Sequence, residues 1–66
     1  MGLAKRTMEI PANDGALTSA AIHYLRQETG ASMFTVEPGN DGVAIHYRSR
    51  DDREFEWVDG EFQPKS

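Results

Sequence analysis

The stretch from Val43 to Trp57, V-A-I-H-Y-R-S-R-D-D-R-E-F-E-W, decides the fold of this chain. Apolar residues occupy every second position in each of its two halves: Val43, Ile45 and Tyr47, then Phe55 and Trp57. A period of two is typical of a β-strand with one buried face. The stretch therefore predicts two strands whose apolar side chains lie on the same side of a sheet.

We expect these two strands to form a hairpin with its turn at Arg50-Asp51-Asp52. The register then pairs apolar residues on the buried face, Tyr47 with Phe55 and Ile45 with Trp57. On the exposed face it pairs polar residues, Arg48 with Glu54 and His46 with Glu56. A shift by one residue would bury two glutamates, which is too costly without partners.

The segment before this stretch predicts one strand and one helix. Residues 1–6 form a basic lead-in that we expect to be frayed, and Thr7–Ile10 reads as a short strand that Pro11 ends. A helix is predicted over Gly15–Thr29, with an apolar stripe of Leu17, Ala21, Tyr24 and Leu25. Asn13 or Asp14 can cap its first N–H groups, and Gly30 is a natural left-handed end.

Two further strand pairs complete the expected sheet. Ser32–Glu37 reads as a strand, and the turn residues Pro38–Asp41 place Phe34 opposite Ile45. Asp59-Gly60 predicts a tight hairpin that brings Trp57 opposite Phe62. The chain is thus expected to be a single α+β domain over residues 1–66, ordered β-α-β-β-β(-β). One helix covers one face of a mostly antiparallel sheet, and the first strand pairs with an outer strand or with a second copy.

Composition narrows the functional class. The 66 residues carry a net charge of −4 and contain no cysteine, so disulfides and thiolate metal sites are excluded. The lack of cysteine fits a cytoplasmic location. No apolar run approaches the roughly 18 residues of a membrane span, so we expect no membrane association. The sequence pI near 4.9 speaks against a general binder of polyanions and favours a basic partner.

Acidic residues are concentrated near the C-terminus: the segment from Asp51 to Glu61 holds six acids and one base. The predicted exposed face carries Met33, Thr35, Glu37, Ala44, His46, Arg48, Glu54, Glu56 and Val58. Carboxylates on a rigid sheet can meet a basic partner or imitate a phosphate backbone. We therefore expect a protein-binding surface made of Glu37, His46, Arg48, Asp51, Asp52, Glu54, Glu56, Asp59 and Glu61. The simpler reading is a charged face that provides solubility and protects strand edges.

The sequence predicts no catalytic, cofactor or metal site, and hence a protein that is not an enzyme. His46 beside Glu56 is the strongest candidate for a base with its orienting acid or for two metal ligands. No serine or cysteine nucleophile is tied to this pair and no third ligand is evident. We therefore interpret it as a cross-strand polar pair.

The leading prediction is a small non-enzymatic interaction module, an inhibitor or regulator that docks its acidic face on a nucleic-acid-handling protein. One alternative is a nucleic-acid binder that uses Arg48, Arg50, Arg53 and the arm of Lys5 and Arg6. Another is a structural subunit that forms homo-oligomers, since a thin core favours pairing. The order of elements resembles that of small sheet-and-helix domains, including many short phage and mobile-element proteins. This resemblance does not rest on a particular sequence motif.

Overall fold

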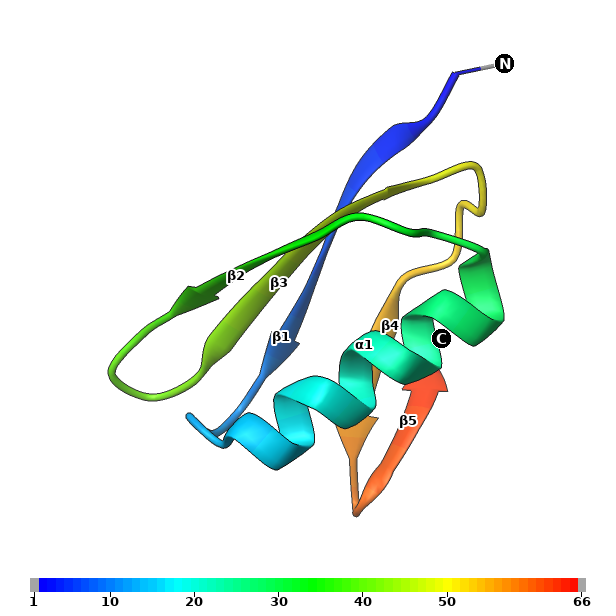
Figure 1. Ribbon diagram of the computed structural model, residues 1–66. Helices are drawn as coiled ribbons and strands as arrows, with labels where there is room; N and C mark the ends of the chain where they lie inside the picture. Colours follow the sequence, from blue (N-terminus) through cyan, green and yellow to red (C-terminus); the bar gives the residue numbers. More distant parts are fainter. Residues whose placement is uncertain (1, 66) are drawn as a thin grey trace.

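The computed structural model describes residues 2–65, which form one helix and five strands (Figure 1). In chain order these are β1 (Ala4–Ile10), α1 (Gly15–Thr29), β2 (Phe34–Pro38), β3 (Val43–Ser49), β4 (Phe55–Val58) and β5 (Glu61–Pro64). All strand pairs are antiparallel. The predicted α+β fold with one helix is therefore confirmed.

The strands form two separate sheets. One has the order β1-β3-β2, and the other is a ribbon of β4 and β5. The predicted hairpin between β3 and β4 is thus wrong: Ile45 lies opposite Met8 and Val36, and Tyr47 lies opposite Arg6 and Phe34. The alternation along β3 identified its buried face correctly, because Val43, Ile45 and Tyr47 are all buried. Alternation alone does not determine which strand is the neighbour.

Strand β1 occupies the place that the prediction gave to β4. It pairs with β3 along its full length, from Ala4 opposite Ser49 to Ile10 opposite Val43. The expectation of a frayed lead-in through residue 6 is wrong for residues 4–6, and Met1 lies outside the described residues. The sequence concealed this longer strand because a charged side chain, Arg6, stands at an inward position.

The helix has the predicted bounds. Of the two candidate caps, Asp14 is the one used: its carboxylate accepts from Ala16 N at 2.9 Å and from Leu17 N at 3.1 Å. At the other end Gly30 adopts a left-handed conformation with φ 75°, and its N–H donates to the carbonyl of Arg26. Both ends therefore satisfy backbone groups that a helix leaves unpaired.

The β2–β3 hairpin differs from the prediction by two residues in register. Phe34 lies opposite Tyr47 rather than Ile45, and Pro38 lies opposite Val43. The strand runs to Pro38, and the turn closes with a bond from Gly39 N to Gly42 O of 2.7 Å. A shift of two keeps each side chain on its predicted face. The Asp59-Gly60 hairpin is confirmed, with Trp57 opposite Phe62 and ring centroids 4.5 Å apart.

The core lies between the three-stranded sheet on one side and α1 with the ribbon on the other (Figure 1). Its buried apolar residues come from all of these parts: Met8, Ile10, Ala21, Leu25, Ala31, Val43, Ile45, Tyr47 and Phe55. Tyr24 joins helix to ribbon, because its ring lies 5.5 Å from that of Phe55 and 5.2 Å from that of Phe62. The opposite face of the three-stranded sheet is left open. Among the described residues, no helix has the length and apolar character to cross a membrane.

Candidate functional site

The open face of the three-stranded sheet carries three rows of side chains that run across the strands. The register places Lys5 beside Arg48 at one end, Thr7 beside His46 in the middle, and Glu9 beside Ala44 at the other end. Strand β2 adds Thr35 to the middle row and Glu37 to the last. The charge on this face therefore changes from positive to negative along the strand direction.

His46 stands at the centre of the face and bridges all three strands. Its Nδ1 lies 3.0 Å from Thr7 Oγ1, and its Nε2 lies 2.9 Å from Glu37 Oε1. Because a carboxylate only accepts, the Nε2–H of His46 donates to Glu37, while Nδ1 shares a hydrogen bond with the Thr7 hydroxyl. The expected pairing of His46 with Glu56 is wrong, because β4 is not a neighbour of β3.

The line from Thr7 through His46 to Glu37 has the order hydroxyl, imidazole, carboxylate known from hydrolases. In those enzymes the carboxylate is buried and a set of donors stands ready for an oxyanion. Here the side chains of His46 and Glu37 are 43% and 72% exposed. In this fold the line connects side chains of β1, β3 and β2 through two hydrogen bonds.

A groove with a volume of about 580 Å³ lies at the acidic end. Its lining includes four carboxylates, Glu9, Glu37, Asp41 and Glu56, together with the ring of Trp57. No lysine or arginine is present among the described residues that line it. Two of the predicted binding residues, Glu37 and Glu56, thus come together here from different sheets.

The outer side of the ribbon extends the acidic surface. Cross-strand pairing puts Glu56 beside Gln63 and Val58 beside Glu61, while Trp57 and Phe62 share the inner side. Of the predicted residues, Asp59 is exposed in the turn of this ribbon and Glu61 on β5, whereas Glu54 is exposed in the connection just before β4. The expectation that Glu54, Glu56 and Val58 share one sheet face with His46 and Arg48 is wrong, because the ribbon is a separate sheet.

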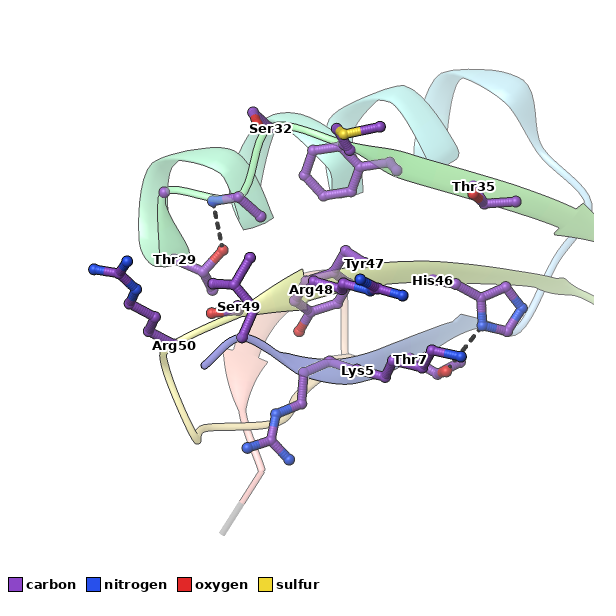
Figure 2. A pocket seen from close by; sticks show the side chains of 16 residues that line it. Lys5, Thr7, Thr29, Ser32, Thr35, His46, Tyr47, Arg48, Ser49 and Arg50 are labelled. Carbon is purple, nitrogen blue, oxygen red and sulfur yellow. Dashed lines mark hydrogen bonds between the residues drawn. The ribbon is translucent and has the colours of Figure 1, made fainter. Parts of the chain in front are cut away.

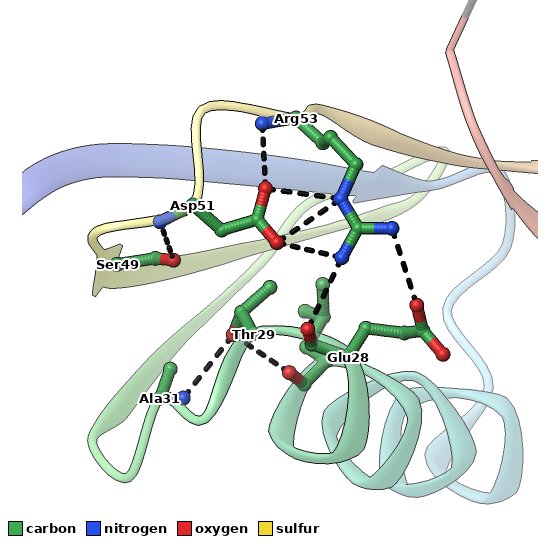
Figure 3. Close-up of polar contacts among 7 residues, drawn as sticks. Glu28, Thr29, Ala31, Ser49, Asp51 and Arg53 are labelled. Carbon is green, nitrogen blue, oxygen red and sulfur yellow. Dashed lines mark hydrogen bonds and ion pairs between the residues drawn. The ribbon is translucent and has the colours of Figure 1, made fainter.

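Asp51 has a different role from the one expected. Arg53 donates to both of its carboxylate oxygens and also reaches Glu28 at the end of α1 (Figure 3). These bonds from Arg53 lower the pKa of Asp51 from 3.8 to about 2, and the bond to Asp51 raises the pKa of Arg53. Asp51 is therefore committed to an intramolecular contact, whereas its neighbour Asp52 is exposed.

A larger groove, of about 1070 Å³, lies at the basic end of the sheet (Figure 2). Four cationic residues line it: Lys5, Arg6, Arg48 and Arg50. No aspartate or glutamate is present among the described residues that line it. The loop that carries Ser32 forms one side, and β3 with Arg48 forms the other.

Sequence reasoning missed two residues of the acidic groove, Glu9 and Asp41, which depend on the placement of β1 and on the β2–β3 turn. The alternation of Met8, Glu9 and Ile10 already indicated that Glu9 faces outward. The alternation did not show which strand lies beside this one. Comparison of the chain with protein-family models, with curated proteins and with solved structures found no match.

Proposed function

We propose that this chain is a small acidic protein-interaction module, without enzymatic activity, that docks its carboxylate-lined end on a basic surface of another protein. The observation that carries the proposal is the groove lined by Glu9, Glu37, Asp41 and Glu56 with no base among its described lining residues. The lack of cysteine favours action in the cytoplasm.

The four carboxylates of this groove come from four different parts of the fold. Glu9 and Glu37 extend from strands on either side of β3, Glu56 comes from the ribbon, and Asp41 comes from the β2–β3 turn. Charges fixed on a rigid frame lose little conformational freedom on binding. Their summed negative potential speeds encounter with a basic surface and disfavours acidic partners.

A basic groove that handles nucleic acid is the kind of partner surface that suits such a carboxylate array. Carboxylates spaced along a sheet present negative charge much as a phosphate backbone does, so they can compete for the same lysines and arginines. The role that follows is that of an inhibitor or regulator which occupies the partner's groove.

The test compares two variants with the same change of net charge. Glu9→Gln with Glu56→Gln removes two groove carboxylates, and Asp52→Asn with Glu54→Gln removes two exposed carboxylates outside the groove and outside the ribbon. Affinity capture from the native host should retain the same partner on the wild type and on the control. The groove variant should lose it at least about tenfold. Equal retention on both variants would contradict the proposal.

A further inference from the structure

The basic groove supports a second inference, which does not depend on the function proposed for the acidic groove. Four of the seven lysines and arginines of the chain line it. Two of them come from β1 (Lys5 and Arg6), one from β3 (Arg48), and Arg50 follows directly after β3. In a protein whose net charge is −4, this gathering of cations marks a local site for an anion.

These cations form no ion pair within the described part of the chain, although Arg6 lies close enough to Asp51 to act on it electrostatically. Arg53, in contrast, is paired with both Asp51 and Glu28. Arg6 differs from the other three cations of the groove, because it stands at an inward position of β1 opposite Tyr47 and its Nε is buried.

The end of α1 lies beside the groove, since Thr29 and Gly30 line it. A helix C-terminus carries partial negative charge on its free carbonyls and would repel an anion. Two of these carbonyls already accept hydrogen bonds, Arg26 O from Gly30 N and Glu28 O from Arg53. Their bonds reduce the negative potential at this helix end.

The acidic end is too distant to cancel the positive potential. Lys5 and Glu9 lie on the same face of β1, four residues apart. An extended strand rises about 3.3 Å per residue, so the two side chains start roughly 13 Å apart. This exceeds the Debye length of about 8 Å at physiological ionic strength. Each end of the sheet therefore presents its own charge to a ligand.

The aromatic rings near the groove are not free to stack on bases. Phe34 lies between the guanidinium of Arg26, 5.3 Å from its centroid, and the ring of Tyr47, 5.9 Å away. Tyr47 is itself only 4% exposed. Binding of single strands relies on such stacking, whereas duplexes are held through their phosphates.

We propose that this groove binds the phosphate backbone of double-stranded nucleic acid, with the exposed residues Lys5, Arg48 and Arg50 as its contacts. The binding is independent of base sequence. Three cations that neutralise three phosphates give a slope of log K against log salt of about −2.7. Arg53, which the sequence suggested as a further contact, is excluded by its ion pairs.

The experiment measures fluorescence anisotropy of a labelled 20-base-pair duplex with the full chain, from about 25 to 200 mM salt. We expect saturable binding at low salt that a duplex of unrelated sequence competes away. Arg48→Gln with Arg50→Gln should weaken binding at least about tenfold and reduce the salt slope by about 1.8. Lys65→Gln, which removes a cation outside the groove, should leave the affinity unchanged. Circular dichroism confirms that each variant is folded.

The acidic-groove variant Glu9→Gln with Glu56→Gln separates this inference from the proposed function. It should retain the affinity of the wild type for the duplex, even if it loses a protein partner. No duplex binding at 25 mM salt would overturn the inference. Binding of a single strand alone, or equal affinity of the Arg48 and Arg50 variant and the wild type, would also overturn it.

Discussion

Arg53 and Asp51, which are separated by one residue, form a closed ring of hydrogen bonds. The Arg53 side chain donates Nε–H to both Asp51 carboxylate oxygens at 3.0 Å, and its backbone N–H donates to Oδ1 at 2.9 Å. The same guanidinium reaches the carbonyl of Glu28 at 3.1 Å and lies 5.0 Å from the ring centroid of Phe55. This cluster joins the β3–β4 connection to the end of α1.

Replacement of Asp51 by Asn should lower the melting temperature at neutral pH, because Arg53 loses its charged partner. Because the folded pKa of Asp51 is about 2 against an ordinary value of 3.8, its contribution is fully present above about pH 4. It is lost as the pH falls from about 4 to about 2. The difference in melting temperature between wild type and Asp51→Asn should therefore shrink over this range.

The matched control for this experiment is Asp52→Asn, which changes the adjacent, exposed carboxylate. It should melt close to the wild type at neutral pH. If Asp51→Asn and Asp52→Asn behaved alike from pH 7 to pH 2, the Arg53 cluster would have no part in stability.

Phe55 should be the most sensitive position of the ribbon. Its side chain is 1% exposed and contacts the ring of Tyr24 edge-on. Truncation of a buried Phe to Ala costs roughly 3–5 kcal/mol, a large share of the 5–15 kcal/mol that stabilises typical domains. Phe55→Ala should therefore melt far below the wild type when its unfolding is followed by circular dichroism. Phe62→Ala, at a half-buried position, should remain folded with a smaller loss.

Gly42 should not tolerate a side chain. A Cβ at this position would meet the carbonyl oxygen of Ile10 on the neighbouring strand, whereas a Cβ at Gly15 would meet nothing. Gly42→Ala should thus lower the melting temperature clearly, because β1 and β3 must move apart. Gly15→Ala should be neutral or stabilising, since Ala is favoured in a helix. Equal melting temperatures of the two variants would contradict the placement of β1 beside β3.

The two candidate caps of α1 can be separated by mutation. Asp14→Ala removes the acceptor of two N–H groups and should cost about 1 kcal/mol, a fall in melting temperature of roughly 4–8 °C for a domain of this size. Asn13→Ala should cost less, because Asn13 makes only a 3.3 Å bond to the carbonyl of Gly39. Thermal melting of the two variants side by side checks this order.

The sequence predicted those parts of the fold that depend on local signals. The ends of α1 follow from Asp14 and Gly30, and the last hairpin follows from Asp59-Gly60. The partner of β3 is a long-range choice, and alternation fits either neighbour equally well. The β3–β4 hairpin was therefore a plausible error, and the contacts of Arg53 with Glu28 became visible only in three dimensions.

In the candidate site, too, the sequence predicted what depends on local signals and missed what depends on long-range pairing. Which residues face outward was readable from the period of two, so Glu37, His46 and Arg48 were placed correctly on the open face. Which charges gather was not readable, because it depends on strand order. Once β1 lies beside β3, Lys5 joins Arg48 and Glu9 joins the carboxylate end. Two opposite charge regions then replace the single acidic face.

The measurement that tests this separation of charge most directly is amide chemical-shift mapping by NMR, with two probes added in turn to the same labelled sample. A DNA duplex should shift the amides around Lys5, Arg48 and Arg50, and a lysine-rich peptide should shift those around Glu9, Asp41 and Glu56. Overlapping shifts for the two probes, or no shift with either one, would contradict the existence of two independent binding regions.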